Sequence, residues 1–388
     1  MKVICDRAAL LEAVNLVTSV APSRSPKPQL TCVRLTASRE ADAGLLTLAA
    51  TDTEVSLSIA DANVEVQEPG EALVPADKLR QIVQAEDADA TLTIETDNDA
   101  VHIRGADAKF TVFGYPAAEF PPMPRFADAG ESVITIQARE LVRLVSRTLF
   151  ATARETSRYA INGVLLKCSG KKLELVATDG RRLAHAKGSI DGGALSETES
   201  VSCIIPSKAM SLVSKLVGGR DEAVRIGVTD NQAFFALGDP GDDPDAVISC
   251  SLVEGAFPPY EDVIPRDQDK RATFEVDSIT SAFRRAALLT NEESRGVRLS
   301  FQKGKGKSGT TLRLSSRAPE MGEAEITVGL DDFDGDEIEI GFNPQFILDA
   351  LKVVDIDRVV FEMKAPNKPG TLKADTDFTY VVMPVNLQ

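Results

Sequence analysis

The chain alternates between two hydrophobic periodicities, one typical of helices and the other of strands. In three stretches far apart in the sequence, apolar residues recur at the spacing of one helical face. The positions concerned are Leu10, Val14 and Val17, then Leu141, Val145 and Leu149, then Ile279, Phe283 and Ala287. We therefore predict three amphipathic helices, each at the start of a similar unit.

A second landmark also occurs three times: an apolar strand that ends in proline or asparagine and runs into another predicted helix. Its copies are ALVPADKLRQIV, CIIPSKAMSLV and IGFNPQFILDAL. A closing strand follows, and Phe110 and Pro116 in the first copy match Phe378 and Pro384 in the last. The copies repeat at roughly 130 residues, which is the size of a domain rather than of a solenoid repeat.

The repeat predicts three similar domains, at residues 1–128, 129–266 and 267–388. Each has the order helix, strands, helix, strands, which is typical of an α+β fold with antiparallel hairpins. The proline-rich segments AEFPPM and GAFPPYEDVIP follow the first two copies. We expect them to be extended and fairly stiff linkers.

The most distinctive stretch of the second copy is ATDGRRLAHA, from Ala177 to Ala186. It continues an apolar alternation, and Asp179-Gly180 is a hairpin signal, because glycine supplies the positive φ of a tight turn. The first copy contains an echo, LTLAATDTEVSLSI, which again predicts a strand, a turn and a strand. In the second copy the turn places Arg181 and Arg182 at its mouth.

Composition limits the classes of protein to which the chain can belong. The 388 residues are 43% hydrophobic and include five cysteines and two histidines. No apolar run is long enough for a transmembrane helix, and the N-terminus lacks the apolar core of a signal peptide. The odd number of cysteines, without a C-x-x-C pair, predicts reduced and mostly buried thiols in a cytoplasmic protein. With so few histidines and no cysteine cluster, we expect no metal site and no cofactor.

The net charge of −16 argues against nucleic-acid binding, but the basic residues are unevenly distributed. Like charges at helical spacing cost roughly a few tenths of a kcal/mol per pair, so an external partner is expected to offset them. The alternative is a solvated helix face. A phosphate-tracking surface would favour duplex DNA, because no aromatic residues alternate with the cations. The cations on predicted helices are Arg139, Arg143 and Arg147 on one stripe, which Arg154 and Arg158 extend, and Lys78, Arg80, Lys208, Lys215, Arg284 and Arg285.

The sequence contains no recognisable catalytic constellation. Asp179 beside two arginines is explained by a turn, and neither His102 nor His185 has a serine or cysteine close in sequence. The acidic pairs lack a glycine-rich or metal-binding signature. We therefore predict a protein that is not an enzyme.

These features together resemble the bacterial β sliding clamp, the processivity factor of the replicative DNA polymerase III holoenzyme. The resemblance covers the whole chain and rests on MKV at the start, VPA, IIP, VATDGRRLA, RGVRL, IGFN and the ending YVVMPVNL. It implies a head-to-tail homodimer that forms a ring of six domains, with helices lining the hole and antiparallel sheets outside. Double-stranded DNA would pass through the ring, and basic helices inside an acidic exterior would suit that arrangement.

The resemblance also implies particular site residues. Contacts to DNA are expected from Arg24, Arg158 and Tyr159, besides the helix cations. At the subunit boundary, Phe110 and Val112 of one copy are expected to meet Leu288 and Leu289 of the other. Peptide motifs of the polymerase, the clamp loader and repair proteins are expected to bind a pocket between domains two and three, formed by Ile161, Thr178, Gly180, Arg181, Arg182, Leu183, Pro258, Val263, Asn343, Phe346, Val382, Met383, Pro384, Val385 and Leu387.

Two other functional classes remain open at this point. One is a three-domain scaffold that oligomerises without DNA, and the other is an unrecognised hydrolase. The basic stripes on the helices favour a clamp over a scaffold, and the missing catalytic set counts against a hydrolase.

Overall fold

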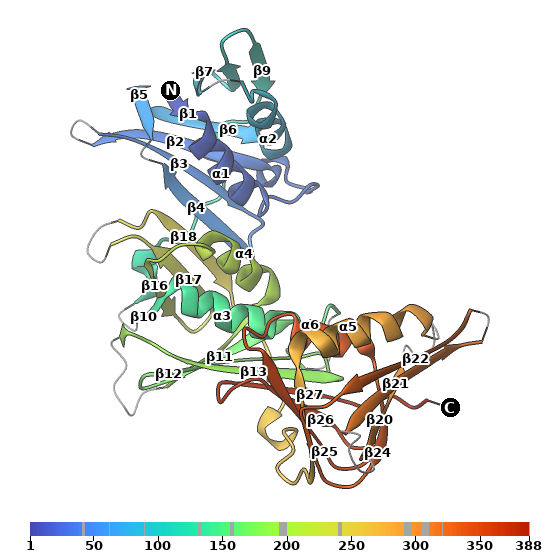
Figure 1. The fold of residues 1–388 in the computed structure, drawn as a ribbon. Coiled ribbons are helices and arrows are strands. Elements are labelled where there is room, and N and C mark those ends of the chain that lie inside the picture. Colours follow the sequence, from blue (N-terminus) through green and yellow to red (C-terminus); the bar gives the residue numbers. More distant parts are fainter. Residues whose placement is uncertain are drawn as a thin grey trace. The chain divides into compact units, whose positions relative to one another are not determined.

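The computed structural model describes residues 1–40, 43–61, 63–88, 90–130, 133–155, 159–193, 200–239, 243–290, 296–303, 310–319 and 321–387. These residues form two compact units. The first unit comprises Met1–Val142, Ile190–Glu199 and Lys208–Leu252, and the second comprises Arg143–Ser189, Ser200–Ser207 and Val253–Gln388. Each unit contains two antiparallel sheets together with helices (Figure 1).

The first unit contains a five-stranded and a nine-stranded sheet. The smaller sheet has the order β5 (Val64–Glu68), β1 (Lys2–Asp6), β7 (Thr91–Asp97), β8 (Ala100–Arg104) and β9 (Lys109–Phe113). The larger has the order β14 (Gly192–Gly193), β10 (Val133–Gln137), β16 (Ala223–Val228), β17 (Gln232–Leu237), β18 (Ala246–Ser251), β4 (Val55–Asp61), β3 (Ala43–Thr51), β2 (Cys32–Glu40) and β6 (Gly70–Pro75). Its helices include α1 (Arg7–Thr18), α2 (Ala76–Ala85) and nearly all of α4 (Ser207–Val217).

The second unit contains a nine-stranded and a four-stranded sheet. The larger has the order β15 (Ser200–Pro206), β11 (Gly163–Ser169), β12 (Lys172–Thr178), β13 (Arg182–Ser189), β27 (Phe378–Val382), β26 (Gly370–Lys373), β25 (Arg358–Met363), β19 (Lys270–Glu275) and β23 (Asp332–Asp334). The smaller has the order β22 (Gly322–Gly329), β21 (Thr311–Ala318), β20 (Val297–Gln302) and β24 (Ile338–Phe342). Its helices include α5 (Val276–Ala286) and α6 (Pro344–Leu351), and α3 (Ala138–Leu149) runs from one unit into the other.

Five short 3₁₀ helices complete the elements found in the described ranges. They are η1 (Pro28–Thr31), η2 (Ala117–Glu119), η3 (Phe126–Ala129), η4 (Tyr260–Asp262) and η5 (Ala287–Leu289).

Both nine-stranded sheets join strands from neighbouring copies of the repeat. In the first unit β18 pairs with β4, and in the second β13 pairs with β27. In the latter pairing Leu183 lies opposite Val381. Continuous backbone hydrogen bonding across two copies explains why contacts divide the chain into two units although the sequence repeat is threefold.

The predicted amphipathic helices are present, and their apolar faces are buried. Leu10 and Val14 of α1 are fully buried, and Ile279 is fully buried in α5. Two helix starts, those of α1 and α6, are capped by a side chain. The Asp6 carboxylate accepts a hydrogen bond from the amide of Ala9 at 2.9 Å at the start of α1, and Asn343 caps α6 in the same way.

The echo found in the sequence is a repeated turn with the same hydrogen bonds in both copies. The Thr178 hydroxyl donates to the carbonyl of Arg182 at 2.7 Å and accepts from the amide of Gly180 at 3.1 Å. The Asp179 carboxylate accepts hydrogen bonds from the backbone amides of Arg181 and Arg182. In the first copy Thr51 and Asp52 make the corresponding contacts, so a Thr-Asp pair specifies this turn.

The two turns have different residues at the position that needs a positive φ. Gly180 has a φ of 84° and Thr53, its counterpart in the first copy, has a φ of 79°. A side chain with a Cβ is strained there, and a β-branched one especially so. Because Thr53 is exposed, its side chain gains little burial in return.

We expect Thr53→Gly to raise the free energy of unfolding by about 0.5–1 kcal/mol. Relief of about 1–2 kcal/mol of left-handed strain should exceed the extra unfolded-state entropy of glycine. Urea denaturation is the measurement. The neighbouring Glu54→Gly is the matched control and should lower the free energy of unfolding. A lower free energy of unfolding in both variants would contradict the proposal that Thr53 is strained.

The cysteines are as predicted, since all five are buried and none forms a disulfide. Burial raises the pKa of the Cys203 thiol to about 12, which keeps it protonated and unreactive at neutral pH. Across the described ranges, no helix has both the length and the apolar character needed to cross a membrane.

Candidate functional site

A pocket of about 200 Å³ lies in the second unit, beside the turn that connects β12 to β13. Four segments form it: the residues just before β11, the β12–β13 turn, the linker that contains η4, and the end of β27. Its lining consists of Tyr159, Ile161, Thr178, Gly180, Arg181, Arg182, Leu183, Pro258, Tyr260, Val263, Val381 and Met383.

Three large apolar side chains at this pocket are unusually exposed. Tyr159 is 41% exposed, Val263 45% and Met383 40%. They come from three different segments, yet they line one small cavity, which the buried Leu183 also lines. Exposed apolar side chains that converge on a concavity are typical of a ligand or peptide site rather than of an ordinary surface.

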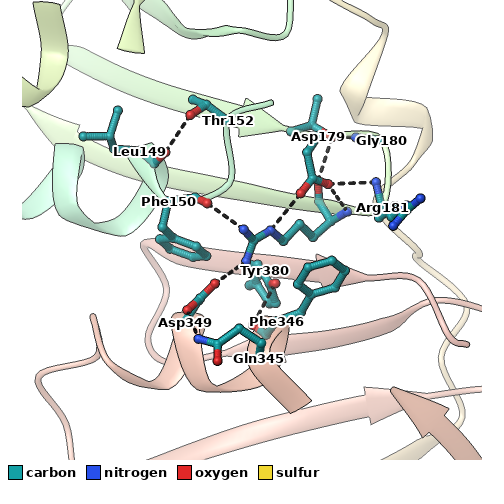
Figure 2. A network of polar contacts seen from close by, with 12 residues as sticks. Leu149, Phe150, Thr152, Asp179, Gly180, Arg181, Gln345, Phe346, Asp349 and Tyr380 are labelled. Carbon is teal, nitrogen blue, oxygen red and sulfur yellow. Dashed lines mark hydrogen bonds and ion pairs between the residues drawn. The ribbon is translucent and has the colours of Figure 1, made fainter. Parts of the chain in front are cut away.

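Arg182 is held by a network that ties the pocket to two helices (Figure 2). Its Nε donates to Asp179 at 3.0 Å, its Nη1 to Asp349 at 2.6 Å, and its Nη2 to the carbonyl of Phe150 at 2.8 Å. The guanidinium also lies over the Phe346 ring at 4.5 Å. Burial acts to lower the pKa of Arg182, but the hydrogen bond to Asp349 and the interactions with Tyr380 and Asp179 outweigh it and raise the pKa. Arg182 therefore fixes the turn against the end of α3 and against α6.

A buried polar cluster supports the linker wall of the pocket from behind. The Tyr260 hydroxyl donates to Glu174 at 3.4 Å, and the Nε2 of His185 lies 2.9 Å from the same carboxylate oxygen. The His185 and Tyr260 rings meet edge to face at 5.5 Å. The hydrogen bond from His185 lowers the pKa of Glu174 against the opposing effect of burial. This cluster holds Tyr260, and with it the linker, against the sheet.

Most of the predicted helix cations are exposed to solvent. Lys208 is exposed but forms an ion pair with Asp52, which belongs to the repeated turn of the first copy. Arg143 is partly exposed and donates to the carbonyl of Lys187 at 3.0 Å. Arg158 lies outside the described residues. The other exposed cations are Arg24, Lys78, Arg80, Arg139, Arg154, Lys215, Arg284 and Arg285.

Arg147 departs from the predicted stripe, and the expectation that it contacts DNA is wrong. Its side chain is 3% exposed, and its Nη1 lies 2.9 Å from Asp375. The guanidinium also lies over the Phe378 ring, at 5.5 Å. Burial acts to raise the pKa of Asp375, but the amide of Asp377 and the charge of Arg147 outweigh it, so that pKa is lowered. A guanidinium buried in this way is structural and is not available to a phosphate.

Comparisons with known proteins agree along the whole chain. Family models of the DNA polymerase III beta subunit match at residues 1–124 for the N-terminal domain, 135–259 for the central domain and 261–386 for the C-terminal domain. The chain belongs to the bacterial β sliding clamp family. It is therefore a DNA sliding clamp, a non-catalytic processivity subunit of DNA polymerase III, and the predicted α+β fold of three similar domains is confirmed.

Similar clamps come from several bacteria. The Beta sliding clamp of Pseudomonas putida is 32% identical over 384 residues, with 98% of this chain and 99% of that protein covered. The Beta sliding clamp of Escherichia coli K12 is 31% identical over 391 residues, with both chains fully covered. Among solved structures, the DNA polymerase III subunit beta of Pseudomonas aeruginosa has a TM-score of 0.86 at 32% identity, with 100% of each chain covered.

The structure brings together most, but not all, of the residues predicted for the clamp pocket. Val382 is fully buried within the sheet, and Asn343 caps α6. Phe346 stacks on Arg182 instead of lining the pocket. The last predicted residues, Pro384, Val385 and Leu387, line a neighbouring cavity of about 470 Å³, which Met383 shares.

Sequence reasoning missed three residues that line the pocket. Tyr159 was predicted only as a DNA contact, and the structure also places it in the lining of this pocket. Tyr260 and Val381 were not predicted. Tyr260 carried a usable signal, because it is the aromatic residue between the prolines of the second linker, directly after Pro258 and Pro259. Val381 has only strand alternation and carries no signal of its own.

We expect Arg147→Gln to lower the free energy of unfolding of the clamp by about 1–3 kcal/mol. The loss should stay below that of a fully buried pair, because the Asp375 left behind is still 30% exposed. Arg139→Gln on the same helix is the control and should change stability by less than about 0.5 kcal/mol. Equal urea unfolding midpoints for the two variants would show that the Arg147 pair is not structural.

Proposed function

We propose that the pocket beside the β12–β13 turn receives an apolar side chain from a short peptide motif of the clamp's partners. The replicative polymerase, the clamp loader and repair proteins would attach to the clamp through such motifs. The observation that carries this proposal is the convergence of Tyr159, Val263 and Met383, all exposed and apolar, on one cavity. A known clamp from Pseudomonas aeruginosa, 31% identical, has been solved bound to griselimycin.

The C-terminal tail would form one side of this peptide site. The amide of Met383 donates to the carbonyl of Arg181 at 2.9 Å, and the amide of Val385 donates to the carbonyl of Gly341 at 2.8 Å. Leu387 packs so closely on Gly341 that a Cβ there would lie 2.6 Å from its Cδ1. The tail is thus docked across the unit, and Met383 remains available at the boundary between the two cavities.

Removing Met383 to Gln388 should therefore lower the affinity for a polymerase-derived peptide by about 2 kcal/mol or more, as expected for a hot spot in a small pocket. Fluorescence anisotropy with full-length and truncated protein measures the change. Leu183→Asp, which places a charge in the lining of the pocket, should have a similar effect. Binding that is unchanged in both variants would move the partner site elsewhere.

The exposed cations are proposed to face duplex DNA. Contacts from Arg24, Arg139, Arg143, Arg284 and Arg285 to phosphates would be independent of base sequence and sensitive to salt. Lys78, Arg80 and Lys208 belong to the same proposed set, and the resemblance to the family adds Arg158 and Tyr159 as expected contacts. Lys208 would have to exchange Asp52 for phosphate, which makes it the weaker candidate.

We also propose that two copies close head to tail into a ring of six domains. Two sheet edges support this, because β9 and β22 each pair on one side only in the described residues. Uncovered edge strands readily pair with another chain. Leu288 is 75% exposed, whereas Val112 is 9% exposed and belongs to the core of its own domain. Phe113, which the sequence did not single out, is 81% exposed on β9 and is the better interface residue on that strand.

A closed ring should stay on circular DNA and leave it when the circle is cut. Gel filtration of the loaded protein before and after linearisation measures this retention. Leu288→Asp should abolish retention by opening the junction, while Ile356→Asp, at a less exposed apolar site, should retain it. Equal retention on linear and circular DNA would show binding without encirclement and would contradict the closed ring. The domain boundaries at 128 and 266 and a cytoplasmic location remain part of this proposal.

A further inference from the structure

Of the two neighbouring arginines at the pocket, Arg182 has its charge paired with carboxylates and Arg181 does not. Arg182 is surrounded by Asp179, Asp349 and the carbonyl of Phe150. Arg181 is exposed, and its guanidinium has no ion-pair or hydrogen-bond partner among the described residues. Figure 2 shows the Arg181 side chain extending away from the cluster that holds Arg182. One positive charge is therefore neutralised and the other is not.

The backbone of Arg181 is held firmly although its side chain is free. Its amide donates to the Asp179 carboxylate at 2.9 Å, and its carbonyl accepts from the amide of Met383 at 2.9 Å. The residue is thus anchored on both sides, by the turn and by the C-terminal tail. Because Arg181 itself lines the pocket, its uncompensated side chain starts from a fixed point at the pocket rim.

The rest of the lining offers no competing charge to a bound peptide. Apart from the two arginines it consists of apolar residues, two tyrosines, Gly180 and Thr178, and no carboxylate is included. The Thr178 hydroxyl is already engaged with the carbonyl of Arg182. An apolar wall excludes water and strengthens a charge interaction at its edge relative to open solvent.

We infer that Arg181 makes this pocket selective for peptides that carry an acidic side chain close to the apolar residue that enters the cavity. The inference rests on the proposed peptide-binding function. A cavity of about 200 Å³ holds one or two side chains, so one anchor of the peptide is fixed there. An extended peptide advances about 3.4 Å per residue, so the acid must lie within one or two positions of the anchor to meet Arg181. Arg182 cannot perform this selection, because its charge is already paired.

The test is a selection of phage-displayed random short peptides on the full-length protein, followed by anisotropy with the best binder. The synthetic peptide is made with Asp, Asn or Lys at the selected acidic position, and its C-terminus is amidated so that a terminal carboxylate does not contribute. The proteins compared are the wild type, Arg181→Gln and Arg181→Glu. Lys171→Gln is the charge control, because Lys171 is exposed in the turn at the opposite end of β12.

Wild-type protein and the Lys171→Gln control should bind the Asp peptide about two- to fivefold more tightly than the Asn peptide, the range of a partly exposed ion pair. The preference should disappear in Arg181→Gln, and Arg181→Glu should prefer the Lys peptide. The preference of the wild-type protein for the Asp peptide should also weaken as the salt concentration is raised. A preference for Asp that persists in Arg181→Gln, or no preference in the wild type, overturns the inference.

Failure of the proposed function would look different. Selected peptides whose binding is unaffected by Leu183→Asp would show that the pocket is not the peptide site, and the selectivity of Arg181 would then be overturned with it. Peptides with an apolar anchor that depend on Leu183 but show no acidic preference would leave the pocket function standing and remove only the role of Arg181.

Discussion

The antiparallel pairing of β13 with β27 is the constraint on which the rest of the second unit depends. It sets Leu183 opposite Val381. The two strands are almost two hundred residues apart and belong to the second and third copies of the repeat. The register then continues past the strand end, where Met383 bonds to Arg181. A shift of one residue would turn Leu183 out of the pocket and bring its neighbours in, because strand side chains alternate between faces. The pocket is therefore a consequence of register.

Burial divides the arginines of this clamp into two kinds. Arg147 is buried and Arg182 is mostly buried; Arg147 pairs with one carboxylate and Arg182 with two, and each guanidinium lies over an aromatic ring. They hold α3 against the strands and loops of the second unit. Exposed arginines such as Arg317 and Arg358 also form ion pairs, but these pairs are open to solvent and weak. The exposed Arg181 is different, because the described residues offer its guanidinium no carboxylate.

The same turn serves two purposes in two copies. Thr51 and Asp52 in the first copy make the hydrogen bonds that Thr178 and Asp179 make in the second. In the first copy Asp52 also pairs with Lys208, whereas in the second Asp179 pairs with Arg182 and shapes a pocket. A local motif fixes the backbone of the turn, and what surrounds it decides whether the turn becomes a site.

The sequence by itself determined the helical faces, the Thr-Asp turn and the threefold repeat of this clamp. The faces and the turn depend on residues close together in the chain, so periodicity and turn chemistry reveal them, and the repeat emerges when the chain is compared with itself. The resemblance to known clamps added most of the pocket residues. Only the tertiary structure decided that Arg147 is buried, that Tyr159 and Tyr260 belong to the pocket, and that Phe113 rather than Val112 faces solvent. Burial and charge compensation arise from segments distant in sequence, and spacing along one helix or strand carries no information about what packs against it.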